Sequence, residues 1–315
     1  MNTQRKRDFL KMGMGAIAGA GLAACGSADA DDNSKPAFVL VHGAWHAAWC
    51  YERVIPLLAA YGHAAVARDL PAHGINARFP ASYFQRPLNP AAFATEPSPA
   101  AVTTLDDYAK SVLDTIDQVR ALGHDKVVLV GHSMGGVAIT AAAERAPEKI
   151  HRLVYLTAFM PKTGVPAISY IQSPENQGEL VGPQLLADPA AIGALRMDQR
   201  SADANYRANG KLAFYGDVSQ QDYDAVANLL TPDVPVAPFA TPITLTPERW
   251  GALDRHYIRC ARDMAIRPPL QQRFIAEADA FVPARKTTVH MLDTSHSPFM
   301  SAPQQLADLL HAIAG

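Results

Sequence analysis

The sequence predicts an α/β protein in which a mostly parallel β-sheet is flanked by helices. Short runs of apolar and β-branched residues, typical of buried strands, alternate along the chain with longer amphipathic stretches, typical of helices. Right-handed crossovers between parallel strands would place those helices on both faces of one sheet. The chain has 315 residues, 49% of them hydrophobic, which is enough to bury a full core.

The individual elements follow from these two patterns. The predicted strands are residues 37–42, 64–70, 126–131, 152–158, 256–260 and 287–292. The predicted helices lie near residues 50–60, 105–122, 134–146, 269–279 and 303–313. This alternation is the pattern of a sheet built from βα units.

Two segments interrupt the alternation. Residues 75–102 hold five prolines and four aromatic residues, and this composition predicts a long surface loop. Residues 162–250 are rich in Ala, Asp, Gln and Pro without a convincing strand, which predicts a helical cap inserted between two core strands. Because loops of such length in a compact domain are usually binding segments or lids, we expect both near a site.

The first 36 residues differ in composition from the rest. Four basic residues precede an apolar, Gly/Ala-rich stretch at 12–24 that is too short to span a membrane, and Leu22–Cys25 resembles the bacterial lipobox. We therefore expect residues 1–24 to be an export signal and Cys25 to carry lipid. The protein would then be exported from a bacterial cytoplasm and be lipid-anchored or periplasmic. The basic run also resembles a twin-arginine signal, so the export route stays open, and a leader that remains attached is the alternative. Residues 25–36 predict a flexible tether.

The charge balance and composition exclude several classes of protein. Lys and Arg total 28 against 30 Asp and Glu, so no polyanion-binding surface is indicated, and we expect no nucleic-acid partner. Membrane contact is expected only through lipid at Cys25. The 20 glycines and 24 prolines follow no period, which argues against collagen, solenoids and propellers.

The strongest chemical signal follows the predicted strand at 126–131. The run GHSMGG places Gly131, Ser133 and Gly135 in the pattern Gly-x-Ser-x-Gly, directly before a helical stretch. In a nucleophile elbow, a sharp strand-to-helix turn exposes the serine hydroxyl, and the flanking glycines relieve backbone crowding. The motif and its context predict Ser133 as a nucleophile.

A serine nucleophile needs a histidine that takes its proton and a carboxylate that orients the histidine. In this chain order both partners lie C-terminal to the serine, at the carboxyl ends of strands. Asp263 and His296 follow the last two predicted strands. Asp293 is three residues from His296 on the same loop and Asp279 belongs to a helical pattern, so neither is well placed to orient the base. We therefore predict a Ser133, His296 and Asp263 triad.

The oxyanion of a tetrahedral intermediate needs two N–H donors. We expect one from Met134, directly after the nucleophile, and the other from Ala44, in the loop after the first strand. His42 and His46 are four residues apart on a turn, with no carboxylate or cysteine beside them, so we expect no metal. This chemistry needs no cofactor, and we expect none.

Five segments, in order, resemble a known family: FVLVHGAWHAAWC, GHSMGG, LVYLTAFMP, YIRCARDMAI and DTSHSPFMSAP. They resemble the α/β-hydrolase superfamily, in the branch of plant methyl esterases, hydroxynitrile lyases and related bacterial esterases. The resemblance spans residues 37–315 and implies an α/β-hydrolase fold with a helical cap. It also implies the triad and the oxyanion donors named above. Residues 75–102 are longer than the family's usual connection.

The resemblance implies a serine hydrolase that cleaves a carboxylic ester through an acyl-enzyme. Lyases of this branch carry a threonine after the first-strand histidine and a lysine after the catalytic histidine, whereas this chain has Gly43 and Ser297, so hydrolysis is favoured. Lactone opening, carbon–carbon hydrolysis and small-molecule binding without turnover stay open.

The predicted cap is the guide to the substrate. It carries apolar residues, and Lys and Arg are sparse between residues 162 and 196, so we expect a neutral, hydrophobic ester. Candidate substrate contacts are Trp45, His132 and Phe159, although packing of Trp45 onto the core is the competing interpretation. The aromatic residues of 75–102 either wall the entrance or pack as a surface loop. Cys50 and Cys260 are predicted to be buried thiols rather than a disulfide.

Overall fold

The computed structural model describes residues 35–315. The predicted export signal, Cys25 and all but the last two residues of the predicted tether lie outside the described residues. A six-stranded sheet with the order β2-β1-β3-β4-β7-β8 forms the centre of the described part, and all of its neighbouring strands are parallel. The strands are β1 (Ala37–Val41), β2 (Ala65–Ala67), β3 (Val127–His132), β4 (Ile150–Leu156), β7 (Arg255–Cys260) and β8 (Thr288–Leu292).

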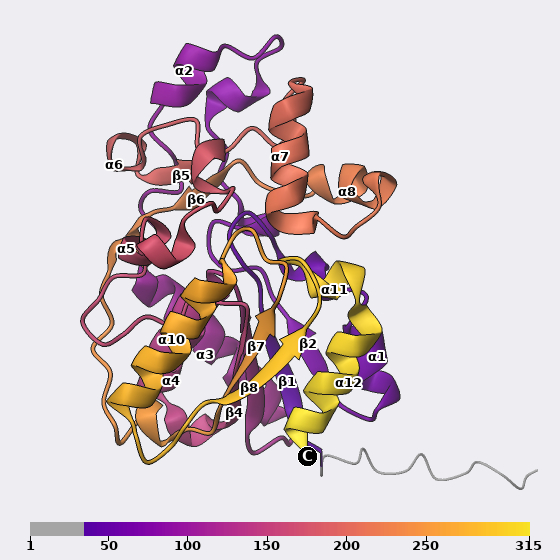
Figure 1. Cartoon of the computed structure of the whole chain (residues 1–315), viewed down its shortest axis with the longest axis vertical. Coiled ribbons are helices and arrows are strands. Elements are labelled where there is room, and N and C mark those ends of the chain that lie inside the picture. Colours follow the sequence, from indigo (N-terminus) through magenta and orange to yellow (C-terminus); the bar gives the residue numbers. More distant parts are fainter. Residues whose placement is uncertain (1–34) are drawn as a thin grey trace, which may run out of the picture. The chain divides into compact units, whose positions relative to one another are not determined.

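Helices cover both faces of this sheet (Figure 1). One face carries α1 (Ile55–Ala60) and α12 (Pro303–Ala314), which contact each other. The other carries α3 (Leu105–Ala121), α4 (Gly135–Arg145) and α10 (Pro268–Phe281). The predicted α/β fold with a mostly parallel sheet is confirmed, and the predicted strands and helices coincide with these elements to within a few residues.

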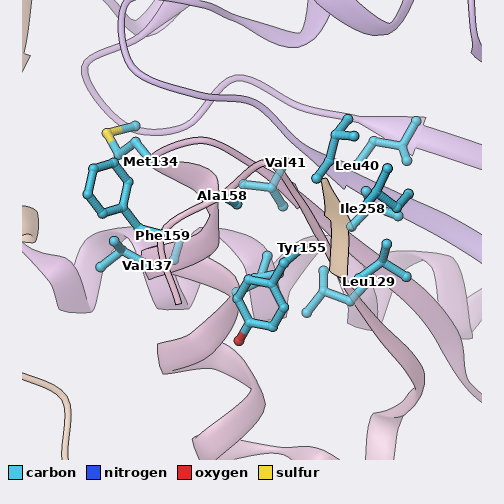
Figure 2. Close-up of a cluster of buried hydrophobic side chains, with 14 of the residues drawn as sticks. Leu40, Val41, Leu129, Met134, Val137, Tyr155, Ala158, Phe159 and Ile258 are labelled. Carbon is cyan, nitrogen blue, oxygen red and sulfur yellow. The ribbon is translucent and has the colours of Figure 1, made fainter. Parts of the chain in front are cut away.

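Local sequence explains where these elements begin and what they bury. Helix α3 begins at a capping box in which Thr104 and Asp107 exchange hydrogen bonds, which satisfies amide groups at the helix start. Strands β1 and β3 are buried along their whole length because helices cover both faces. Figure 2 shows apolar side chains of β1, β3, β4 and β7, such as Leu40, Leu129 and Ile258, gathered in the core with the start of α4.

Between β4 and β7 the chain forms a cap above the carboxyl ends of the strands (Figure 1). Its helices are α5 (Ile168–Ile171), α6 (Pro189–Ile192), α7 (Ala204–Tyr215), α8 (Gln220–Ala227) and α9 (Ala237–Ala240). The sequence pattern indicated no strand here, but β5 (Ala194–Arg196) and β6 (Asp233–Pro235) form a small antiparallel sheet. Three residues are too few to produce a recognisable period of two, so the pattern could not reveal these strands.

Residues 75–102 are not the plain surface loop that their prolines suggested. They contain α2 (Pro90–Thr95), and the side chains of Tyr83 and Phe93 are buried. The segment packs on the cap through Arg196, whose guanidinium donates to the carbonyl oxygens of Phe93 and Glu96 and pairs with Asp233 at 2.6 Å. Backbone carbonyl oxygens of residues 75–102 therefore accept hydrogen bonds from the Arg196 guanidinium, which is buried in the cap.

Three further features concern the two described cysteines, the lengths of the helices and the last short helix. Cys50 and Cys260 are buried and unpaired, as predicted. Between residues 35 and 315 no helix is both long and apolar enough to cross a membrane. The last short helix, α11 (Pro298–Ser301), lies between the loop of His296 and α12.

Candidate active site

Ser133 lies at the turn between β3 and α4, at the carboxyl edge of the sheet. Its φ of 53° is in the left-handed region, which costs energy for a residue with a side chain, as in a nucleophile elbow. The flanking glycines make the turn possible: a Cβ at Gly131 would lie 2.8 Å from the carbonyl oxygen of Gly135. The Ser133 residue is 8% exposed and lines a cavity.

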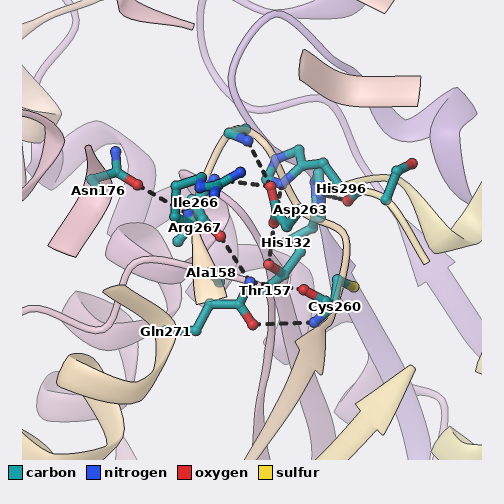
Figure 3. A network of polar contacts seen from close by, with 12 residues as sticks. His132, Thr157, Ala158, Asn176, Cys260, Asp263, Ile266, Arg267, Gln271 and His296 are labelled. Atoms are coloured by element: carbon teal, nitrogen blue, oxygen red, sulfur yellow. Dashed lines mark hydrogen bonds and ion pairs between the residues drawn. The ribbon is translucent and has the colours of Figure 1, made fainter. Parts of the chain in front are cut away.

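His296 and Asp263 form a buried pair beside this turn (Figure 3). The His296 Nδ1 is 2.7 Å from the Asp263 Oδ2, and neither side chain is exposed. Because a carboxylate accepts, Nδ1–H donates and Nε2 carries the free lone pair of the neutral ring. Within residues 35–315 this Nε2 has no hydrogen-bond partner. The histidine is therefore oriented with its basic nitrogen unoccupied.

Asp263 is itself fixed by hydrogen bonds. Its Oδ1 accepts from the amides of Ala265 at 2.7 Å and Ile266 at 2.9 Å, and its Oδ2 also accepts from the hydroxyl of Thr157. Hydrogen bonds from donors stabilise the ionised form of a carboxyl group. The rival acid Asp293 is 85% exposed and pairs with Arg262 instead.

His132 connects the loops of Ser133 and His296. It precedes Ser133, its ring centroid is 4.6 Å from that of His296, and its Nε2–H donates to the His296 carbonyl oxygen at 2.9 Å. The residue is fully buried and is not among the residues that line the cavity. The structure thus places His132 against the catalytic candidates rather than at a substrate, because its ring is used to join the two loops.

The loop after β1 is held in place by hydrogen bonds that its backbone carbonyl oxygens accept. Nδ1–H of His42 donates to Gly43 O at 2.9 Å, which fixes the peptide plane that carries the Ala44 N–H. His46 Nδ1–H donates to Ala44 O at 2.7 Å, and the Thr231 amide donates to the Trp45 carbonyl at 3.0 Å. These bonds hold a loop in which Trp45 has a φ of 60°.

The surroundings of His42 and His46 in this loop favour the neutral form of each ring. Burial lowers the pKa of His46 to about 3 and that of His42 well below its usual value. The opposite nitrogen of His42 also requires a neutral ring, because Nε2 accepts from the Leu70 amide at 3.0 Å. His46 Nε2 is 2.6 Å from the Tyr215 hydroxyl, which donates to it when the His46 ring is neutral. Each ring therefore donates through Nδ1 and accepts through Nε2.

The two expected oxyanion donors lie on either side of Ser133. Met134 is the N-cap residue of α4, and the first amides of a helix have no partner within it. The helix dipole there favours a negative charge. Ala44 lines the same cavity as Ser133.

A largely apolar cavity opens at Ser133. Trp45 and Phe159, two of the candidate substrate contacts, belong to its lining, and no described lining residue comes from 75–102. The aromatic residues of that segment therefore do not wall this cavity, because they pack on one another and on the cap. The cavity is lined by Ala44, Trp45, Ser133, Phe159, Ile171, Asn176, Glu179, Val181, Leu195, Phe214, Phe239, Ala265 and Ile266.

Glu179 is the one acidic residue of this lining. It accepts from the amides of Val181 and Gly182, and burial raises its pKa. The lining contains no Lys, Arg or His. Across residues 35–315 no group of three or more His, Cys, Asp or Glu side chains could hold a metal ion, and the expected absence of metal and cofactor stays a prediction.

Sequence reasoning missed the residues that hold the candidate triad and the oxyanion loop. It considered His42 and His46 only as metal ligands, and it passed over Thr157 and Tyr215. The available signal was that His42 and His46 closely flank the expected oxyanion donor. Thr157 and Tyr215 gave no such signal, because their partners are more than 100 residues away in the sequence.

Comparison with known proteins places the chain in a family. A model described as the alpha/beta hydrolase family matches residues 38–309. The chain belongs to the alpha/beta hydrolase family. It is 30% identical over 291 residues to methylesterase 7 of Arabidopsis thaliana and 31% identical over 289 residues to methylesterase 1 of the same plant. Each match covers 90% of this chain and 98% of the relative.

Solved structures of the family agree on the fold. The pyrethroid hydrolase PytH superposes with a TM-score of 0.68 at 24% identity, covering 89% of this chain and 97% of that one. Polyneuridine aldehyde esterase superposes with a TM-score of 0.66 at 24% identity, covering 89% and 100%. The resemblance to the methyl esterase branch of the α/β hydrolases is thus confirmed, and the relatives support an esterase function on this fold.

The same relatives contradict the predicted localisation. They are plant methylesterases, and some are described as chloroplastic, which points away from a bacterial exported lipoprotein. The predicted export, signal peptide and lipid anchor at Cys25 rested on the composition of a short N-terminal segment. Basic residues before a Gly/Ala-rich stretch are a weak pattern that does not specify a compartment, and the predicted localisation is wrong. The predicted signal peptide and lipid anchor have no support in these relatives and lie outside the described residues.

Proposed function

We propose that the protein is a serine hydrolase that cleaves a neutral, hydrophobic carboxylic ester through an acyl-enzyme. Ser133 is the nucleophile, His296 the general base and acid, and Asp263 the orienting carboxylate. The observation that carries this proposal is the buried His296–Asp263 pair, whose Nε2 has no hydrogen-bond partner within residues 35–315. The His296 ring packs against His132, which directly precedes the strained turn of Ser133. The domain that performs the reaction spans residues 37–315, with the cap at about 162–250.

The reaction divides into acylation and deacylation. His296 Nε2 takes the proton of Ser133 Oγ as this oxygen attacks the ester carbonyl. The amides of Ala44 and Met134 stabilise the oxyanion, and collapse expels the alcohol, which receives the proton from His296. Water, deprotonated by the same nitrogen, then attacks the acyl-enzyme and releases the carboxylic acid and free Ser133.

The cavity supports the substrate class. Its walls are mostly apolar, and Glu179 is its charged member, so a neutral substrate is favoured over an anionic one, which would need a cation. The methylesterase relatives support an ester of a small alcohol. We therefore propose a methyl or other small alkyl ester of a hydrophobic acid, with Trp45 and Phe159 as substrate contacts.

The lyase alternative is disfavoured by Gly43. A Cβ at this position would lie 2.8 Å from the Cβ of Ser133 and 2.8 Å from Nδ1 of His132, so the threonine of the lyases does not fit without a shift. Ser297 stands where the lyases have lysine, and it is fully buried. Lactone and carbon–carbon bond hydrolysis use the same catalytic groups and stay as alternatives.

Hydrolysis of a neutral aryl ester by the wild type and by Ser133→Ala tests the proposal. The wild type should turn the ester over, and the variant should lose at least about 10³-fold in kcat while keeping its thermal unfolding midpoint. A receptor that only binds small molecules would bind the ester without turnover. A variant that keeps more than a few per cent of the activity would remove Ser133 from its role.

A further inference from the structure

One short part of the cap contacts both loops that the proposed chemistry needs. Residues 214–217, here called the α7 turn, end helix α7 and lead out of it. Phe214 lines the cavity, and its ring centroid is 5.8 Å from that of His296. The next residues bind the oxyanion loop on one side and the histidine loop on the other.

Tyr215 reaches the oxyanion loop. Its hydroxyl is 2.6 Å from Nε2 of His46, and both side chains are buried. Since His46 Nδ1–H donates to the Ala44 carbonyl, Nε2 of the neutral ring must accept and the Tyr215 hydroxyl must donate. A chain of two hydrogen bonds therefore runs from the cap to Ala44, whose N–H is a proposed oxyanion donor.

Asp217 reaches the loops of the base and the acid. Its carboxylate accepts from the Ser295 amide at 2.8 Å and from the Ser295 hydroxyl, and Ser295 immediately precedes His296. It also lies 3.4 Å from Arg262, which immediately precedes Asp263. The Asp217 side chain is only 9% exposed and Ser295 is buried, so the contacts between these two residues are sheltered from water.

We propose that Tyr215 and Asp217 are positioning residues through which the cap holds the oxyanion loop and the histidine loop in their reactive arrangement. The inference rests on the proposed function and deepens it, because the cap then contributes to the chemical step as well as to substrate binding. Neither residue belongs to the lining of the cavity at Ser133. Small displacements of reacting groups are costly, so loosening either anchor should lower kcat more than it changes KM.

The test compares Tyr215→Phe and Asp217→Asn with two matched controls. Tyr206→Phe removes another hydroxyl of α7, which donates to the Gln184 carbonyl at 2.7 Å, away from the site. Asp222→Asn changes another cap carboxylate that binds an arginine and a serine, Arg53 at 3.0 Å and Ser219 at 2.8 Å. Four quantities are measured for each: kcat and KM with a neutral aryl ester, affinity for an alkyl boronic acid, and the thermal midpoint.

We expect both test variants to lose about 10- to 100-fold in kcat, with KM within about twofold of the wild type. Affinity for the boronic acid, which binds serine as a tetrahedral anion, should fall by a similar factor. The controls Tyr206→Phe and Asp222→Asn should keep the kcat of the wild type and its affinity for the boronic acid. A test variant whose kcat stays within about twofold of its control, or whose loss appears only in KM, overturns the inference.

Two further outcomes are also decisive. If Asp217→Asn does not fold, Ser295→Ala takes its place, because it removes one donor to Asp217 and leaves the α7 turn intact; an unchanged kcat then overturns the role of Asp217. If the wild type neither turns over esters nor binds the boronic acid, the proposed function fails. Ester turnover in the wild type with unaffected variants removes the inference alone.

Discussion

His296 donates a hydrogen bond from Nδ1 to the Oδ2 of Asp263 over 2.7 Å, and both side chains are completely buried. This arrangement fixes the tautomer of the ring and leaves Nε2 without a hydrogen-bond partner among the described residues. Asp293, three residues from His296 in sequence, does not take part, because its side chain is exposed and paired with Arg262.

Asp263→Asn should therefore abolish most of the activity, while Asp293→Asn should not. An amide at position 263 can donate to Nδ1 and favour the wrong tautomer, which costs about 10⁴-fold in kcat in a known serine protease. We expect a loss of about 10³- to 10⁴-fold for Asp263→Asn and less than about threefold for Asp293→Asn. Ester hydrolysis by purified variants measures both. Similar losses in the two variants would reverse the assignment of the acid.

Gly43→Ala should lower kcat by at least about tenfold. The new Cβ would lie 2.8 Å from the Ser133 Cβ and from Nδ1 of His132, so the oxyanion loop or the elbow must move. Gly210→Ala is the control, because its Cβ would approach nothing closer than the Tyr223 hydroxyl at 3.1 Å. Steady-state kinetics and a thermal unfolding curve are measured for each. Full activity in Gly43→Ala would show that the loop tolerates a side chain there.

Asp233→Ala should be strongly destabilising. It leaves the fully buried Arg196 guanidinium without its carboxylate, and removing one member of a buried pair costs about 3–5 kcal/mol in the free energy of unfolding. Asp224→Ala breaks the exposed pair with Arg207 and should cost less than about 1 kcal/mol. Urea unfolding measures the difference. Equal costs would mean that the buried Arg196–Asp233 pair adds no more to stability than an exposed pair does.

The stability of the protein should fall as the pH drops below about 6.5. The pKa of His46 is about 3 in the folded protein and about 6.5 in an unfolded chain, so below pH 6.5 the unfolded state binds more protons. The contribution of buried, neutral His46 to the free energy of unfolding is complete above pH 6.5. This contribution is lost progressively as the pH falls towards 3. His46→Gln should reduce the slope of unfolding free energy against pH by roughly 1 kcal/mol per pH unit between 6 and 4.

Urea unfolding at pH 7, 6, 5 and 4 measures this slope for the wild type and for His46→Gln. His311→Gln, which removes a partly exposed histidine stacked on Tyr61, is the control. We expect the control to keep a slope near that of the wild type. The same slope in all three proteins would mean that burial of His46 does not contribute to acid sensitivity.

Much of the core could be predicted from sequence, because parallel strands buried on both faces leave continuous apolar runs and amphipathic helices leave a period near 3.6 residues. The loops that carry Ser133, Asp263 and His296 could be located because each follows a predicted strand. Asp263 and His296 form a hydrogen bond, and both follow Ser133 in the order that the elbow motif predicts.

The cap resisted prediction because its structure depends on contacts between distant residues. Strands β5 and β6 pair only through each other and are three residues long. The burial of Phe93 depends on Arg196, 103 residues away, and the link from Tyr215 to His46 spans 169 residues. The predicted localisation failed for another reason, since it was inferred from a short N-terminal segment alone and the plant methylesterase relatives contradict it.

Covalent labelling of the nucleophile tests the central claim most directly. The protein and its His296→Ala variant are treated with an alkyl fluorophosphonate, digested, and mapped by mass spectrometry while ester hydrolysis is followed. The proposed triad predicts one adduct per chain, on Ser133, with activity lost in proportion, and labelling slowed by at least about 10³-fold in the variant. An adduct on another residue, or full ester hydrolysis with Ser133 completely modified, would contradict it.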